Sequence, residues 1–189
     1  MIKRGETTNL IQEARKRRTR LFFEHRDEFM ALLVADIEHA IKRAAKLGMV
    51  PVVRLNGTSD LPFEKFRVGE HRNIMARFPD IQFYDYTKVL PRVLMQQNPG
   101  FPSNYHLTFS LSETNRAEAR VLAQLGYNVT VVCSKDIKAW ALESQPNTID
   151  GDETDLRFLD GSGKIVLLTA KGKAKKDATG FVIRERVLV

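Results

Sequence analysis

Residues 148–164 read TIDGDETDLRFLDGSGK and bring four aspartates and one glutamate close together in the sequence. Three of these carboxylates, Asp150, Asp152 and Asp155, are spaced so that they could hold Mg²⁺ or Mn²⁺, which prefer oxygen ligands. A calcium loop is excluded, because Asp155 stands where that loop needs glycine and Gly161 where it needs glutamate. The stretch is therefore either a divalent-metal site or, as we favour, an acidic turn that leads into a hairpin.

Polar residues follow four successive apolar segments, and their types suit the binding of a polar ligand. If these segments are parallel strands, their carboxyl ends meet at the edge where open α/β sheets bind ligands. Asp60 and Lys88 are the residues least explained as turn formers or helix caps. Turn formation and capping alone are the alternative explanation of these polar loops. The candidate ligand-binding residues are Asn56, Asp60, Asp85, Lys88, Ser110 and Arg157.

Four residues are candidates for catalysis, namely Asp60, Lys88, His106 and Glu113. His106 lies inside an expected strand and shares a face with Thr108 and Ser110. If that face lines a barrel or a cleft, the imidazole could carry a proton near neutral pH. A structural histidine with a satisfied hydrogen bond is the alternative, and the one we favour.

The net charge of +7 is concentrated in two strips. Residues 1–20 contain seven Lys and Arg against two Glu, and residues 161–176 contain five lysines and no acid. Such strips suit contacts with a phosphate backbone, although a solvated, solubilising surface is the alternative. They lack interleaved aromatic residues, so base stacking is not indicated. The candidate nucleic-acid-binding residues are Arg15, Arg17, Arg18, Lys171, Lys173, Lys175 and Lys176.

The elements that must position these groups alternate along the chain. Residues 26–48 show apolar side chains at helical spacing and follow a first helical stretch, so a long N-terminal helical region is expected. From residue 49, four apolar segments alternate with helical ones, which predicts an α/β fold with a parallel sheet, as a partial or open TIM-like barrel. Further on, LRFLD-GSG-KIVLLTA predicts a β-hairpin.

The length of 189 residues suits one well-buried core. We expect a single domain over 1–189, with a helical region at 1–48, βα units at 49–140, and the hairpin and basic loop at 141–189. The single cysteine, Cys133, is expected to be a buried strand thiol. No apolar run approaches the roughly 20 residues of a membrane helix, and the first residues lack a signal-peptide core. A cytoplasmic location follows.

Five segments in order resemble one protein family: VVRLNGTSDLPFE, FPDIQFYDYTK, NYHLTFSLSETN, IDGDETDLRFLD and AKGKAKKDATGF. Over most of residues 10–181 the chain is similar to an uncharacterised phage and mobile-element family labelled gene product eighty-eight. The resemblance implies a viral, prophage or plasmid origin, and hence the cytoplasm of a host cell. It implies no activity and no catalytic residues.

The order of strands and polar loops also resembles, more faintly, part of the barrel of radical S-adenosylmethionine enzymes. Those enzymes hold an iron–sulfur cluster with three clustered cysteines. This sequence has Cys133 alone, so no iron–sulfur cluster is expected.

Three classes of function remain open. The favoured one is a phage- or mobile-element-encoded protein that binds nucleic acid or a host nucleoprotein complex, with counter-defence against a CRISPR or restriction system as one form. The second is a metal-assisted enzyme that acts on a nucleotide or phosphorylated substrate. The third is a degenerate enzyme fold that serves as a scaffold for a host protein.

Overall fold

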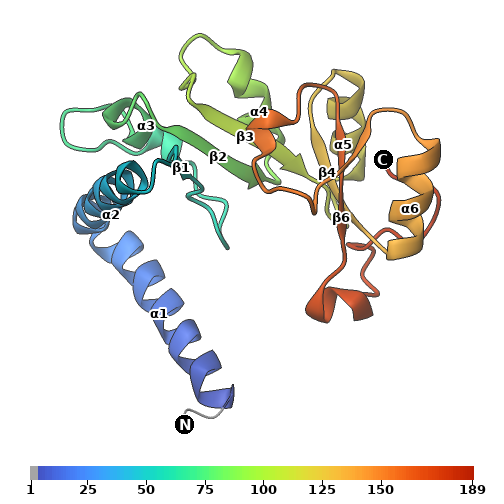
Figure 1. Ribbon diagram of the computed structural model, residues 1–189, viewed down its shortest axis with the longest axis horizontal. Helices are drawn as coiled ribbons and strands as arrows, with labels where there is room; N and C mark the ends of the chain where they lie inside the picture. The colour runs from blue at the N-terminus through green and yellow to red at the C-terminus, as the bar shows by residue number, and fades with distance from the viewer. Residues whose placement is uncertain (1–3) are drawn as a thin grey trace. The chain divides into compact units, whose positions relative to one another are not determined.

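The computed structural model describes residues 4–189, with side chains from residue 10, and its internal contacts divide the chain into two compact units (Figure 1). The first unit comprises the residues up to Pro51 together with Phe63–Phe78. The second comprises Val52–Pro62 and Pro79–Val189.

Two long helices, α1 (Arg4–Glu24) and α2 (Arg26–Lys46), dominate the first unit, as the sequence predicts. The shorter elements are η1 (Phe63–Lys65) and α3 (Ile74–Arg77). Phe22, at the end of α1, is 2% exposed and joins these elements through edge-on contacts with Phe29, Phe63 and Phe66. Such aromatic pairs add to the stability that their burial provides.

The second unit is built on six parallel strands that do not close into a barrel. Their order across the sheet is β1-β2-β3-β4-β6-β5. The α/β class and the parallel sheet are thereby confirmed. The strands are β1 (Val52–Val53), β2 (Gln82–Thr87), β3 (Tyr105–Ser110), β4 (Val129–Cys133), β5 (Thr148–Asp150) and β6 (Ile165–Thr169).

Helices cover one face of this sheet. Residues alternate along the strands, and Phe109, Val131 and Leu167 point to the covered face, where they are almost completely buried. Cys133 lies in the same core, and burial raises the pKa of its thiol to about 11. The covering elements are α4 (Leu90–Leu94), η2 (Met95–Gln97), α5 (Arg116–Gln124) and α6 (Lys135–Ser144).

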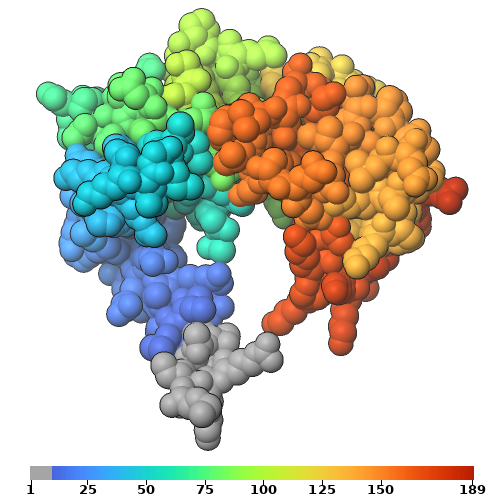
Figure 2. Space-filling view, in the orientation of Figure 1, coloured from blue at the N-terminus to red at the C-terminus, as the bar shows by residue number. Residues whose placement is uncertain are grey.

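The connection from β5 to β6, residues 151–164, crosses the opposite face. The chain advances across the sheet from β1 to β5 and then turns back, so a right-handed crossover must change faces at this point. The contacts agree, because Phe158 packs on Tyr84 and Asp155 accepts hydrogen bonds from the hydroxyls of Tyr84 and Tyr86. Figure 1 shows this segment in orange across the strands, and Figure 2 shows it at the outer surface. We call it the crossover segment.

The predicted hairpin is wrong. Arg157–Leu159 forms a 3-10 turn, η3, and the strand after the glycines pairs in parallel with β4 and β5. Gly161 and Gly163 have φ of 71° and 69°, as turn glycines do. The turn that they form leads into β6, which lies between β4 and β5. Asn128 fixes that entry by accepting a hydrogen bond from the amide of Lys164 at 2.9 Å.

Residues after β6 return to the middle of the sheet. The turn η4 (Gly172–Lys176) is followed by an irregular segment whose Ile183 forms a parallel bridge to Cys133. β3 and β4 pair only through Phe109–Val129 and Ser110–Thr130. Ile183 therefore occupies the edge of β4 that β3 leaves open.

Gly151, at the start of the crossover segment, provides a test of how tightly this segment packs. A Cβ at this position would lie 2.6 Å from Val166 Cγ1 and 2.9 Å from Leu168 Cδ2. We therefore expect Gly151→Ala to lower the free energy of unfolding by about 1–3 kcal/mol, as overpacking does. Gly100→Ala is the control, because nothing lies within 4 Å of its added Cβ. Urea unfolding measures both, and equal stability of the two variants would contradict the packing.

Candidate functional site

A cleft of about 360 Å³ lies at the carboxyl ends of β1, β2 and β3. Three of the predicted ligand-binding residues, Asn56, Asp60 and Lys88, line it, and Ser110 lines its far side. The parallel strands thus bring together residues that are up to 54 positions apart, from Asn56 to Ser110. We call it the strand-end cleft; its lining residues are Arg54, Asn56, Gly57, Thr58, Ser59, Asp60, Tyr86, Thr87, Lys88 and Ser110.

A buried carboxylate, Asp85, holds the floor beneath this cleft. Its Oδ1 accepts a hydrogen bond from the backbone amide of Asn56 at 2.7 Å. Its Oδ2 accepts bonds from Asn56 Nδ2 at 3.0 Å and from the Tyr105 hydroxyl at 2.7 Å. Asn56 Oδ1 in turn accepts bonds from Ser59 and from the amide of Leu61. Asp85 therefore fixes the loop after β1 to strands β2 and β3.

A second carboxylate, Asp60, completes the floor from the loop side. It forms an ion pair with Arg92 of α4, whose side chain is only 5% exposed. It also accepts hydrogen bonds from Thr87 Oγ1 at 3.1 Å and from the backbone amide of Lys88 at 2.8 Å. Arg92 Nη2 then donates to the Tyr105 hydroxyl at 3.1 Å, which joins this group to Asp85. The result is one continuous polar network that is buried at Asp85 and Arg92 and partly exposed at Asp60.

Burial raises the pKa of Asp85 to about 6, although bonds from Tyr105 and Asn56 act in the opposite direction. The predicted residues Asn56, Asp60 and Asp85 are thus brought together, but they bind one another. Lys88 and Ser110 are the predicted residues that face the open cleft. Glu113 is exposed and does not line it.

His106 and Arg157 lie on the other face of the sheet, His106 on β3 and Arg157 within the crossover segment. Arg157 is fully buried, with its Nε 3.3 Å from Asp160 Oδ2, and it also donates to the carbonyl of Thr154. His106 Nε2 is buried without a hydrogen-bond partner among the described residues. Burial and the nearby charge of Arg157 lower the pKa of His106, which favours the neutral imidazole.

The three carboxylates of the proposed metal site are each engaged with the protein. Asp150 and Asp152 both bind Lys138, and Asp152 also pairs with Lys171 at 2.8 Å. Burial alone would raise the pKa of Asp152, but its bonds from Lys138 and Lys171 hold it well below the usual range. Asp155 instead pairs with Arg54 at 2.8 Å. Within residues 4–189 no group of three or more His, Cys, Asp or Glu is arranged for a metal.

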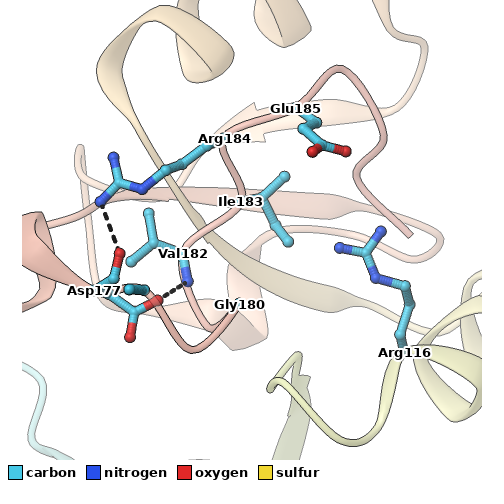
Figure 3. A pocket seen from close by; sticks show the side chains of 8 residues that line it. Arg116, Asp177, Gly180, Val182, Ile183, Arg184 and Glu185 are labelled. Carbon is cyan, nitrogen blue, oxygen red and sulfur yellow. Dashed lines mark hydrogen bonds between the residues drawn. The ribbon is translucent and has the colours of Figure 1, made fainter.

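The basic residues predicted to contact nucleic acid are exposed in both units. In the first unit, Arg15, Arg17 and Arg18 are exposed along α1. In the second unit, the lysines at 171, 173, 175 and 176 lie on or beside η4. Beside η4 is a hollow of about 300 Å³, into which Figure 3 shows Arg116 reaching from α5, opposite the segment that carries Arg184.

Comparison with known proteins gives one match. The family model described as gene product 88 covers residues 3–185 of the sequence. The chain belongs to the gene product 88 family. No curated protein and no solved structure matches it. None of the helices among the described residues of this family member is long and apolar enough to cross a membrane.

Several important residues of this gene product 88 family member were not found from the sequence. Arg92 and Lys138 lie within helices, where a charged residue normally indicates a solvated face, yet they are 4% and 8% exposed. Their partners, Asp60 and Asp150, come from other elements. Arg54 follows β1 and Arg116 begins α5, and neither residue belongs to a sequence motif that indicates a function.

Asp85 should leave a signature in the pH dependence of stability. Its pKa is raised from 3.8 to about 6, so between these values the folded chain holds a proton that the unfolded chain releases. Stability from this residue is therefore present below about pH 4 and lost as the pH rises through 6. We expect wild type to lose about 2–3 kcal/mol relative to Asp85→Asn between pH 4 and 7.

Urea unfolding of both chains at several pH values checks this expectation. Asp80→Asn is the matched control, because it removes a carboxylate at an exposed position. A gap between wild type and Asp85→Asn that stays constant with pH would show that Asp85 is already ionised in the folded chain near pH 4.

Proposed function

We propose that this protein binds nucleic acid through an exposed basic surface formed by Lys173, Lys175, Lys176, Arg184 and Arg116. The observation that carries the proposal is the exposure of Lys173, Lys175 and Lys176 on a single turn, without an acidic partner among the described residues. Uncompensated lysines on one turn suit a ligand that presents a row of negative charges, as a phosphate backbone does.

The turn that carries these lysines is held in place by its own hydrogen bonds. Arg184 Nη2 donates to the carbonyl of Lys175 at 2.8 Å, as Figure 3 illustrates for its neighbouring bond to Asp177. The carboxylate of Asp177 accepts from Thr179 at 2.8 Å and from the amide of Val182 at 3.1 Å. Asp177 is thus occupied within its own loop, and the lysine ammonium groups remain free for an external anion.

Arg116 extends the same surface into the hollow beside η4. Among the described residues its guanidinium has one hydrogen-bond partner, the carbonyl of Val187 at 3.5 Å. Figure 3 shows the guanidinium beside the hollow, whose lining also includes the acidic residues Asp177 and Glu185. A guanidinium with free N–H groups is a preferred partner of phosphate oxygens.

The arginines of α1 support the same function from the first unit. Arg15, Arg17 and Arg18 are all exposed, whereas Lys16 pairs with Glu13 at 2.8 Å. Contacts of this kind depend on the charge of the phosphate backbone and not on the base sequence. The expected binding is therefore salt-dependent and largely independent of the nucleotide sequence. Nucleoprotein complexes expose the same backbone, and blocking a host defence complex is one form the activity would take.

The first prediction concerns the lysines of η4. Replacing Lys173, Lys175 and Lys176 with Gln should weaken binding and reduce the slope of log K against log salt by about 2–3, near 0.9 for each lost contact. Fluorescence anisotropy of labelled single- and double-stranded DNA and RNA at several salt concentrations measures this slope. The control replaces the exposed Lys42, Lys46 and Lys65 with Gln and removes the same charge. Equal slopes in the two triple variants, or no binding by wild type near physiological salt, would contradict the proposal.

The second prediction concerns α1. Reversing Arg15, Arg17 and Arg18 to Glu should weaken binding and flatten its salt dependence, because repulsion replaces three attractive charges. The same anisotropy titration applies, with replacement of the three arginines by Lys as the charge-preserving control. Unchanged affinity of the Glu variant would remove α1 from the interface.

A further inference from the structure

We propose that the strand-end cleft binds a phosphate monoester, with the ammonium group of Lys88 as the main charged contact. The cleft encloses about 360 Å³, within the range of about 300–1,000 Å³ that small-ligand pockets occupy. It lies at the carboxyl edge of the sheet, where open parallel sheets bind ligands. This inference goes beyond nucleic-acid binding, because the cleft shares no residue with the basic surface.

The carboxylates of the floor are not free to act as acceptors for a ligand. Asp85 is engaged by Asn56 and Tyr105, and Asp60 by Arg92 and the amide of Lys88. The carboxylate oxygens of Asp60 and Asp85 are therefore already engaged and do not favour the binding of a cation. The same bonds hold the cleft's loop and the backbone of Lys88 in fixed positions, so the site is formed before a ligand arrives.

The groups that remain at the surface of the cleft are donors. Lys88 Nζ lies 5.2 Å from the centre of the Phe181 ring and has no acidic partner among the described residues. Arg54, the other cation of the lining, is compensated by Asp155. The side-chain hydroxyls of Thr58 and Ser110 make no hydrogen bond within the part of the chain that the structure describes. The cleft thus offers one uncompensated positive charge and two free hydroxyls.

The backbone adds further donors from the loop after β1. The amides of Gly57, Thr58 and Ser59 make no hydrogen bond to described residues. Successive free amides in a loop are a common means of holding phosphate. A phosphate monoester has three terminal oxygens and can accept from the ammonium, the hydroxyls and the amides at once. A carboxylate has two oxygens in one plane and would leave several of these donors without a partner.

Isothermal titration calorimetry of the full chain with adenosine monophosphate, inorganic phosphate and acetate tests the proposal. We expect the first two to bind and acetate to bind far more weakly. Lys88→Met should weaken the affinity for adenosine monophosphate by about 10- to 100-fold, as the loss of a charged hydrogen bond does, and Lys88→Arg should retain most of it. Lys135→Met is the matched control, because Lys135 is an exposed lysine at the start of α6, near the end of β4 and outside the cleft.

The proposal would be overturned by no binding of either phosphate compound at about 10 mM, by equal losses in Lys88→Met and Lys135→Met, or by an acetate affinity equal to that of phosphate. The variants also separate this site from nucleic-acid binding. Lys88→Met should leave the anisotropy titration unchanged, and the Gln variant of Lys173, Lys175 and Lys176 should retain its affinity for adenosine monophosphate. Loss of that affinity in the Gln variant alone would place the phosphate site on the basic surface and not in the cleft.

Discussion

The arrangement of the second unit depends on the handedness of the connections between parallel strands. While the chain advances from β1 to β5, right-handed crossovers keep α4, α5 and α6 on one face of the sheet. Because the strands are parallel, the loops that follow the first three of them lie at one edge, where the strand-end cleft is found. When the chain turns back from β5 to β6, the same rule sends the crossover segment over the other face. Asp155 of this segment then reaches Arg54 and Tyr86, two residues of the cleft lining.

The two faces are consequently held together by different forces. The helix-covered face is apolar around β4, with Phe109, Leu122 and Val131 buried almost completely, and carries the polar network of Asp85 and Arg92 nearer β2. The other face includes buried polar residues, among them Thr108 and Thr130 on the strands and Arg157 of the crossover segment. A buried arginine is costly unless it is compensated, and Asp160 and the carbonyl of Thr154 supply that compensation locally. The crossover segment is thus fixed both by ionic and hydrogen-bonding contacts and by the packing of Gly151 and Phe158 against the sheet.

Sequence patterns predicted the parts of the fold that depend on local signals. The α2 helix and strands β2, β3 and β4 show apolar periodicity and clear turn residues at their ends. The position of β6 could not be predicted in this way. The glycines before Lys164 look the same whether the next strand pairs antiparallel with the segment before it or enters in parallel between β4 and β5. The choice depends on pairing with β4, whose residues are about 36 positions earlier in the chain.

The sequence predicted which residues lie at the candidate site, but not which of them are open to a ligand. Asn56, Asp60, Asp85, Lys88 and Ser110 all lie in or under the cleft, because parallel strands necessarily end at one edge. Arg92 and Tyr105 determine which of these residues remain open to a ligand. Arg92 binds Asp60, 32 positions away, and Tyr105 binds Asp85, 20 positions away. Compensation of a buried carboxylate is a property of three-dimensional packing, and no local pattern in the sequence encodes it.

The bridge between Ile183 and Cys133 affects how this chain is made. About fifty residues separate the two, so at translation rates of roughly 5–20 residues per second the edge of β4 waits for about 3–10 s before its partner leaves the ribosome. During that interval the backbone groups of an apolar strand are open to pairing with other chains. Nascent copies on neighbouring ribosomes of one message are the nearest such chains, so the late arrival of Ile183 leaves β4 open to pairing with them during synthesis.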